Sequence, residues 1–317
     1  MFSFEKPNPP HNYNADSEIQ NLRTHKKKRE IPNKSKDHII IATWNIANFG
    51  LQKRRDSELE LIAEMLSWFD IVGLQEIHDN LHHLRAVLDM LPKSYRIVFN
   101  DRAGNDERSA FVYDSRKISE LEMVGEVAVP PSENRHIKLP GIDRKFKGFD
   151  RNPFFVSFVA GDFEFVIANV HLYFGDDNKK DRERRALEAY AAARWADLRR
   201  DDSHSYSENF MVLGDFNLPK AEHSDPIYRA LTKRGMHRPP HSTRVASNIV
   251  DDKEYDQIFF FPGNTKKRYT GESGVFDFDG AVYPDLWDKV KPDEEKFRKY
   301  IRYYLSDHRP LWAQFKT

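Results

Sequence analysis

Runs of apolar residues alternate with segments of helical periodicity along most of the chain. Ile39 to Trp44 and Ile71 to Leu74 are continuous and rich in β-branched residues, which is typical of strands buried on both faces. The intervening segment predicts a helix, because its apolar residues recur at helical spacing: Leu59, Ile62, Ala63, Leu66 and Phe69. The pattern therefore predicts a β-α-β unit at the start of the folded region.

The same alternation continues to the end of the chain. We expect helices over residues 81–91, 184–200 and 226–235, and strands over residues 95–99, 110–113, 154–160, 163–171, 211–213, 257–261 and 311–315. Gly161-Asp162 joins two of these strands and suits a tight hairpin, so some strands are antiparallel. Two stacked mixed sheets flanked by helices, in one domain, accommodate both the crossovers and the hairpin.

The first 37 residues differ from the rest. They are polar, contain Pro7, Pro9 and Pro10, and include the basic run from Lys26 to Arg29. Little in this segment could form a buried face. We predict a flexible, basic-leaning N-terminal arm over residues 1–37 and a single domain over residues 38–317, and we assign the arm no function.

Composition narrows the classes of function. The 317 residues are 39% hydrophobic, which is ample for an enzyme-sized core. Lys plus Arg and Asp plus Glu both number 50, so the total charge demands no polyanionic partner and any nucleic-acid surface must be local. There is no cysteine, which excludes disulfides, thiolate zinc sites and a cysteine nucleophile. With no apolar run of signal-peptide or membrane-spanning length, we expect a soluble, cytoplasmic protein.

Polar residues stand where the predicted buried strands begin or end. In layered α/β folds ligands bind in the crevice at strand ends, so polar groups from several strands can converge on one point. Each residue alone has a simpler interpretation as a helix cap or turn residue, but independent causes rarely place so many at strand ends. The set is Asn45, Glu76, His171, Asp215 with Asn217, Asp256, and Asp307 with His308.

Three of these residues offer oxygen atoms to a cation. Mg²⁺ takes oxygen ligands, keeps several waters and is commonly held by one or two carboxylates together with a substrate phosphate. Glu76, Asp307 and Asn45 supply such oxygens. We therefore predict a magnesium site, in which Mn²⁺ or Ca²⁺ could substitute or assist.

Two histidines suit proton transfer. His171 and His308 carry side chains whose unperturbed pKa of about 6.5 allows proton exchange at neutral pH. A carboxylate on the other ring nitrogen would fix each tautomer, and Asp256 and Asp101 are the candidates. Asp215, in the segment Gly214-Asp215-Phe216-Asn217, is expected to address the same phosphate or water as Asn217.

Six motifs occur in the order found in the endonuclease/exonuclease/phosphatase superfamily, and the chain resembles that superfamily over residues 39–317. Each motif alone is weak, but six in order are specific. The resemblance implies a four-layered α/β sandwich. The motifs are Thr43-Trp44-Asn45-Ile46, Leu74-Gln75-Glu76-Ile77, Asn169-Val170-His171-Leu172, Leu213-Gly214-Asp215-Phe216-Asn217, Tyr255-Asp256-Gln257-Ile258 and Ser306-Asp307-His308-Arg309-Pro310.

Within the superfamily the chain looks most like the pancreatic-type deoxyribonucleases and their bacterial relatives. This similarity lies in Glu107 to Tyr113, Asn152 to Phe158 and Phe276 to Phe278. One departure concerns His78, where those enzymes typically have an arginine that enters the minor groove. The loop from Pro130 to Asn152, which is rich in Arg and Lys, and the run Lys53-Arg54-Arg55 are candidate substitutes for that contact.

The resemblance implies a role for each matching residue. Glu76 is expected to be the principal metal ligand, supported by Asn45 and Asp307. His171 and His308 are expected to form the acid–base pair, oriented by Asp101 and Asp256. The remaining expected contacts are to the scissile phosphate, the attacking water and the substrate, and they come from Asp215, Asn217, Arg108, Tyr255 and His78.

We expect a Mg²⁺-dependent phosphodiesterase that hydrolyses the nucleic-acid backbone, with DNA as the favoured substrate and little sequence preference. One alternative is a phosphodiesterase of the same fold that acts on RNA or phospholipid headgroups. Another is a catalytically silent binding module. Expected partners are nucleic acid and an unidentified regulatory protein; we expect no membrane partner and a monomeric chain.

Overall fold

A computed structural model describes residues 4–8, 10–78, 80–241, 243–291 and 293–317. Within these residues the strands form a six-stranded sheet in the order β10-β11-β1-β2-β4-β3 and a five-stranded sheet in the order β5-β6-β7-β8-β9. The strands are β1 (His38–Phe49), β2 (Ile71–His78), β3 (Tyr95–Phe99), β4 (Glu107–Asp114), β5 (Ser119–Glu126), β6 (Phe154–Ala160), β7 (Phe163–His171), β8 (Phe210–Asp215), β9 (Asp256–Phe260), β10 (Tyr269–Val275) and β11 (Leu311–Lys316).

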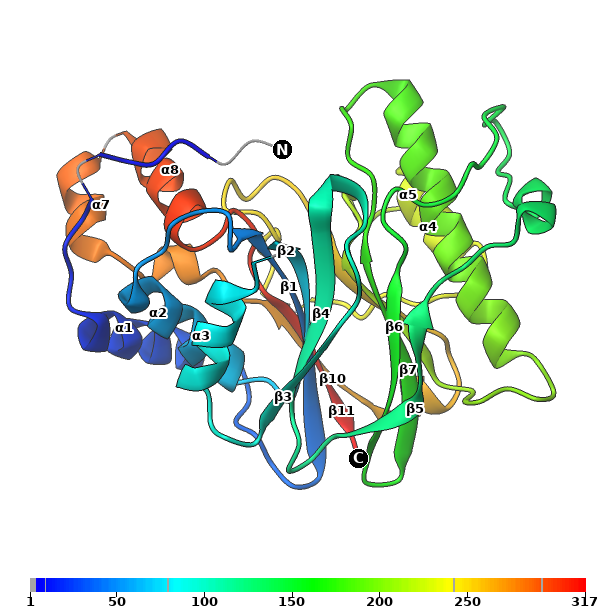
Figure 1. The fold of residues 1–317 in the computed structure, drawn as a ribbon, viewed down its shortest axis with the longest axis horizontal. Coiled ribbons are helices and arrows are strands. Elements are labelled where there is room, and N and C mark those ends of the chain that lie inside the picture. The colour runs from blue at the N-terminus through cyan, green and yellow to red at the C-terminus, as the bar shows by residue number, and fades with distance from the viewer. Residues whose placement is uncertain (1–3, 9, 79, 242, 292) are drawn as a thin grey trace.

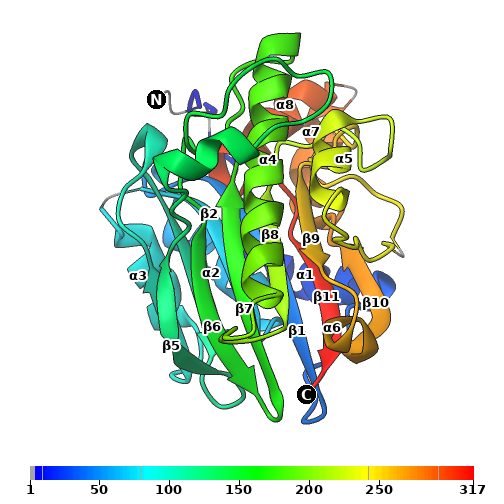
Figure 2. The ribbon, with the colours of Figure 1, turned by 90° about the vertical axis from the view of Figure 1, so that its right-hand side faces the viewer.

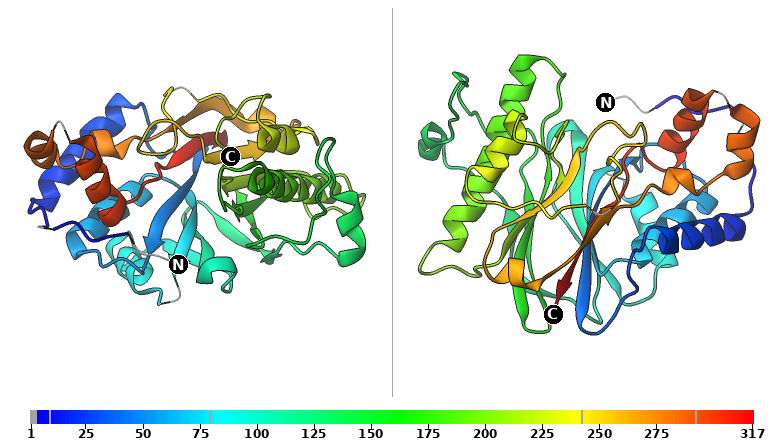
Figure 3. Two further views of the ribbon diagram at one scale, coloured as in Figure 1. Left: turned by 90° about the horizontal axis from the view of Figure 1, so that it is seen from above. Right: turned by 180° about the vertical axis from the view of Figure 1, so that it is seen from behind.

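The two sheets stack face to face and helices cover both outer faces. Figure 1 shows α1, α2 and α3 outside the six-stranded sheet and α4 outside the other. Figure 2 shows α4 lying over β7 and β8, and both views of Figure 3 show the same layers. The α-helices are α1 (Ala15–Lys28), α2 (Asp56–Ser67), α3 (His82–Met90), α4 (Lys179–Arg200), α5 (Pro226–Thr232), α6 (Asn264–Arg268), α7 (Pro284–Val290) and α8 (Glu294–Tyr304).

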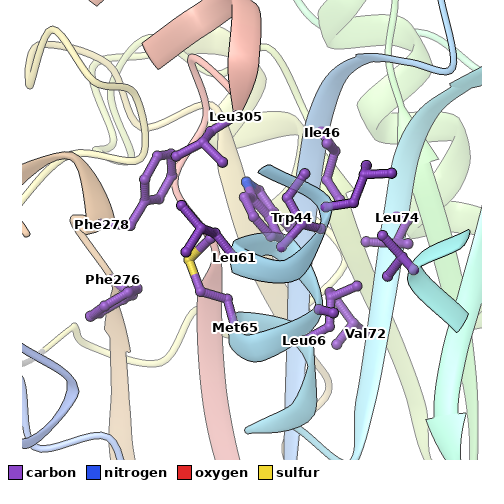
Figure 4. Packing of buried hydrophobic residues seen from close by; sticks show 14 of the residues in the cluster. Trp44, Ile46, Leu61, Met65, Leu66, Val72, Leu74, Phe276, Phe278 and Leu305 are labelled. Carbon is purple, nitrogen blue, oxygen red and sulfur yellow. The ribbon is translucent and has the colours of Figure 1, made fainter. Parts of the chain in front are cut away.

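Three hydrophobic cores hold the four layers together. One joins the N-terminal and C-terminal helices to the six-stranded sheet, one lies between the sheets and one joins α4 and α5 to the five-stranded sheet. Figure 4 shows the first core, in which Trp44 and Val72 of the sheet pack with Leu61 and Met65 of α2. The predicted four-layered α/β sandwich is therefore confirmed.

Strand direction brings distant motifs to one edge of the sandwich. β1 and β2 are parallel, as are β7 and β8, so their carboxyl ends lie together in each pair. β11, β4 and β9 run antiparallel to their neighbours, so they present their first residues at that same edge. The register places His171 beside Asp215 and Asp215 beside Asp256.

Most predicted elements are present, including the antiparallel β6–β7 hairpin at Gly161. Sequence patterns missed β5, β10, α1, α6, α7 and α8. β5 is a sheet edge whose residues are all exposed or only partly buried, so it lacks the continuous apolar run that marked the other strands. None of the helices in the described residues has an apolar stretch long enough to cross a bilayer.

The N-terminal segment differs from the predicted loosely attached arm. α1 packs against α2, with Leu22 fully buried and Arg23 bound to Glu64 at 2.8 Å. His25 and Arg29 both contact Asp277, which follows β10. This attachment was missed because α1 is polar and uses ion pairs more than a broad apolar face.

Candidate active site

Asp215, the last residue of β8, lies at the centre of the converging strand ends. Its Oδ2 is 3.1 Å from Asn45 Nδ2, 3.6 Å from His171 Nε2 and 3.8 Å from His308 Nε2. Asp215 is only 1% exposed. Burial raises its pKa, but His308 and His171 outweigh that effect and hold the pKa below its ordinary value. Asp215 is thus an ionised carboxylate between two imidazoles.

His308 is held on its other ring nitrogen by Asp256. Nδ1 is 2.8 Å from Asp256 Oδ2, and the Tyr255 ring lies alongside the imidazole with centroids 5.7 Å apart. Ser306 Oγ accepts a hydrogen bond from the His308 backbone N–H, while Trp44 Nε1 donates to its carbonyl at 2.8 Å. Burial lowers the pKa of His308, but the two aspartates hold it well above its ordinary value.

His171 takes its carboxylate partner from Glu107. His171 Nδ1 lies 2.9 Å from Glu107 Oε2, and both side chains are less than a tenth exposed. Arg151 donates to the His171 carbonyl at 2.9 Å. Burial and Arg151 lower the pKa of His171, whereas Glu107 and Asp215 raise it, and the net effect is a raised pKa.

The predicted partner of a histidine, Asp101, lies elsewhere. Its side chain is 90% exposed and accepts a hydrogen bond from Arg108 at 3.0 Å. The expectation that Asp101 orients a histidine was therefore wrong in placement, and Glu107 stands in that position. Glu107 begins a strand that lies antiparallel beside the end of β2, opposite His78, and no local sequence signal marks that pairing.

Glu76 and Asn45 lie side by side at the ends of β2 and β1. Asn45 Nδ2 donates to Glu76 Oε1 at 2.9 Å, and the Asn48 backbone N–H donates to Glu76 Oε2 at 2.8 Å. Glu76 has a left-handed backbone with φ of 59°, which costs of order 1–3 kcal/mol and is typical of functional sites. Asn45 Oδ1 is buried and accepts no hydrogen bond from the described residues.

The predicted ligands are one candidate set for a metal ion, and a cluster of close-lying ligand atoms in the described residues is another. Glu76, Asn45 and Asp307 offer oxygen atoms alone; burial and the charge of Glu76 both raise the pKa of Asp307, as expected of carboxylates gathered for a cation. In the second cluster the ligand atoms of Asp215, Asp256 and His308 lie within 4.8 Å of one another. An all-oxygen set suits Mg²⁺ better than a set containing a ring nitrogen.

Asn217 and Arg108 lie beside this centre, each with part of its side chain committed to the protein. Asn217 follows Asp215 with φ of 49°, so this segment is not the extended one that the sequence suggested. Its Nδ2 donates to the Leu172 carbonyl, and its backbone N–H donates to Asp215 Oδ1. Arg108 donates to the Asn100 carbonyl and lines a small cavity together with Glu76 and His171.

Two of the basic or polar residues considered for DNA contact are buried. His78 is 8% exposed, which limits what its ring can present to a substrate. Arg54 is 7% exposed, and its guanidinium donates to the carbonyls of Ala47 and Leu305. Arg55 forms an ion pair with Glu58. Of the run at residues 53–55, only Lys53 is fully exposed, so the run does not form the predicted basic contact surface.

Solved structures share this fold. Among solved structures, the chain is similar to an endonuclease/exonuclease/phosphatase family protein from Bacteroides thetaiotaomicron, with a TM-score of 0.58 and 20% identity over 88% of this chain and 95% of that one. It is also similar to a mannosyl-6-phosphatase of the same organism, with a TM-score of 0.56 and 22% identity over 87% of this chain and 98% of that one. The chain has the endonuclease/exonuclease/phosphatase fold, and its relatives are hydrolases of nuclease or phosphatase type.

The chain is also similar in sequence to a deoxyribonuclease of Thioalkalivibrio sp. (strain K90mix). It is 25% identical over 297 residues, which cover 90% of this chain and 73% of that protein. No protein-family model matches the chain. The resemblance predicted from the six motifs, to the superfamily and to deoxyribonuclease-like nucleases, is confirmed.

Proposed function

We propose that this protein is a divalent-metal-dependent phosphodiesterase that hydrolyses the nucleic-acid backbone, with DNA as its substrate and Mg²⁺ as its metal. One observation carries the proposal. Asp215 lies between the Nε2 atoms of two histidines, and each histidine has a carboxylate on its other ring nitrogen. This is the arrangement that two-sided proton transfer around one reacting phosphate requires.

Glu76, Asn45 and Asp307 fit a magnesium ion. The buried Asn45 Oδ1 has no donor among the described residues, and Glu76 and Asp307 are close enough that the first raises the pKa of the second. When bound, Mg²⁺ would neutralise phosphate oxygens and stabilise the charge that develops on them. The role of each ligand is part of the proposal, with Glu76 as the principal one.

The side chains of the chain itself move the protons. The Nε2 atoms of His171 and His308 lie 3.6 and 3.8 Å from Asp215 Oδ2. One histidine takes a proton from a water while the other donates to the leaving oxygen. Glu107 and Asp256 fix their tautomers by holding Nδ1. Asp215 and Asn217 position the water and phosphate, assisted by Arg108. A well-placed acid or base of this kind contributes about 10²–10⁴-fold to the rate.

The preference for DNA rests on similarity to a deoxyribonuclease over most of both chains. If the protein grips mainly the phosphate backbone, cleavage will show little base preference and will weaken as salt is added. Tyr255, which lies against His308, is proposed to contact the substrate. Substrate choice in a shared catalytic core falls to the loops, so RNA and phospholipid are the comparisons that matter.

The test is a nicking assay on supercoiled plasmid with purified protein and Mg²⁺. We expect relaxed circles with Mg²⁺ and none with chelator, and a loss of at least about 100-fold in Glu76→Gln, His171→Ala and His308→Ala. His204→Ala is the matched control, because His204 is exposed in the turn after α4, away from the site.

Parallel reactions with RNA, a phospholipid and a phosphomonoester show which class of substrate the protein hydrolyses fastest. Faster hydrolysis of any of these than of DNA would replace the proposed substrate. Nicking that survives chelator or Glu76→Gln would refute the metal-dependent mechanism. A parent protein that cleaves none of the substrates would favour a silent binding module.

A further inference from the structure

A second cavity opens directly beside the catalytic centre. It has a volume of about 210 Å³ and is lined by Asp307 and His308. It is also lined by four residues of α8, the cations Arg298, Lys299 and Arg302 and the carboxylate Glu295. The proposed mechanism uses none of these three cations, so their place beside the catalytic histidine needs another explanation.

The charge of Arg302 acts on Asp307 at a distance, but in the described residues no direct ion pair holds the guanidinium. Its Nε is buried and has no acceptor among the described residues. The ring of Phe4 lies over the guanidinium at 4.1 Å. Such stacking engages the face of the guanidinium and leaves its in-plane N–H groups directed at other partners. A partly buried, unpaired Arg beside an active site is costly unless an anion binds there.

The other two cations are only weakly compensated. Arg298 stands one turn before Arg302, so both can address one ligand from the same helix face. Arg298 contacts Glu294 at 2.7 Å and Lys299 lies 4.0 Å from Glu295, and in both pairs the acidic side chain is more than half exposed. Exposed pairs of this kind hold their cations loosely and release them readily to a stronger anion.

We propose that Arg302 and Arg298, with Lys299 at the rim, bind a backbone phosphate of a DNA chain next to the phosphate that is cleaved. This inference rests on the proposed function, since it places the substrate strand across the same site. Asn248 and Tyr255 also line the cavity, together with His308. A phosphate held here would fix the strand relative to His308.

The proposed subsite would let the protein discriminate a polynucleotide from a small phosphate ester. A sugar monophosphate or a simple aryl diester has no second phosphate to reach α8, whereas every internal position of a DNA chain does. The subsite therefore predicts an advantage for polymeric substrates that comes from binding. It also supplies a contact surface that the buried Arg54 and His78 do not.

The experiment compares Arg302→Gln and Arg298→Gln with Lys296→Gln. Lys296 is exposed on the same helix and lies outside the cavity. Its substitution removes the same charge as the arginine variants, so it controls for long-range electrostatics. Binding of a fluorescein-labelled DNA duplex is measured by anisotropy in chelator across a salt series. Log affinity falls as log salt rises, and each arginine variant should make the steepness of this fall smaller by about 0.9. The factor by which DNA affinity drops between about 50 and 200 mM salt should therefore be about threefold smaller than in the parent.

Catalysis gives the second measurement. In Mg²⁺, both arginine variants should raise KM for the duplex and leave kcat/KM for bis(p-nitrophenyl) phosphate unchanged, and Arg302→Lys should restore part of the salt slope. Arginine variants that bind and cleave like Lys296→Gln would overturn the subsite while leaving the proposed function intact. A parent that binds DNA through Arg302 but cleaves nothing would refute the proposed function alone.

Discussion

Glu107, and not the exposed Asp101, is predicted to control the protonation of His171. The perturbation is Glu107→Gln, which keeps the shape of the side chain and removes its charge. Asp101→Asn is the matched control, because it removes the same charge from the carboxylate that the sequence suggested. The structure places Glu107 Oε2 2.9 Å from His171 Nδ1 and leaves the Asp101 side chain 90% exposed.

The size of the effect follows from the burial of this pair. Both side chains are less than a tenth exposed, so solvent screens their interaction little. A hydrogen-bonded contact to a charged group contributes about 1.5–3 kcal/mol. Because the Glu107 carboxylate raises the pKa of His171, its loss lowers that pKa. If the same free energy stabilises the transition state, kcat falls by about 10- to 150-fold.

Two assays check this prediction. NMR titration of the histidine signals, with His171 assigned from its absence in His171→Ala, measures the pKa without reference to activity. The pH dependence of plasmid nicking gives the kinetic counterpart, in which the limb governed by His171 moves to lower pH because the carboxylate no longer stabilises the imidazolium. For Asp101→Asn we expect an unshifted His171 pKa and a rate within about twofold of the parent.

Equal His171 pKa values and equal nicking rates in Glu107→Gln and Asp101→Asn would refute this prediction. An unchanged His171 pKa in Glu107→Gln would show that the contact does not bear on protonation. A large loss of rate in Asp101→Asn with a normal Glu107→Gln would restore the assignment drawn from the sequence.

Three further predictions concern stability. Gly214→Ala should destabilise the fold by about 3 kcal/mol or more in urea denaturation, because Gly214 has φ of +134° and an added Cβ would lie 2.0 Å from the Val170 carbonyl oxygen. Burial raises the pKa of Asp277, but hydrogen bonds from His25 and Arg29 lower it to about 2. Its stabilising contribution of about 2 kcal/mol is therefore present above pH about 4 and lost as the pH falls towards 2, and Asp277→Asn should abolish that pH dependence. Trp44→Phe should cost about 1–3 kcal/mol and slow nicking, since the buried His308 carbonyl loses its donor; unchanged melting would contradict this.

The convergence of polar residues at one edge was predictable from local patterns. Continuous apolar runs mark buried strands, and the residue after such a run must lie at the strand end. This was sufficient to bring together Asn45, Glu76, His171 and Asp215, which the parallel pairs β1–β2 and β7–β8 place at the same edge. Neither sheet order nor register was needed for that step.

The pairing of each histidine with its carboxylate was harder to predict. The sequence offered Asp101 and Asp256 as candidates, and Asp256 lies 2.8 Å from His308 Nδ1. Glu107 escaped because the start of β4 reaches the site only through its antiparallel pairing with β2 and the stacking of one sheet on the other. Neither relation leaves a local trace in the sequence.

Elements at the margins of the fold were missed for a related reason. α8 is the clearest case, since its apolar face is largely aromatic and lies between charged residues, including Arg298 and Arg302. α1 buries Leu22 and relies on ion pairs for the rest of its attachment. Such elements gain their stability from partners far away in the chain, which periodicity alone does not reveal.

In each of the two histidine–carboxylate pairs, the histidine comes from one sheet and the carboxylate from the other, and the sheets exchange these roles between the pairs. His171 belongs to the five-stranded sheet and its partner Glu107 to the six-stranded one, whereas His308 leads into the six-stranded sheet and its partner Asp256 begins β9 of the other. Neither sheet alone carries a complete pair, so the proposed proton-transfer site exists only when the sheets are stacked. The core between the sheets is thus part of the site, because any shift of one sheet against the other changes both His–carboxylate distances together.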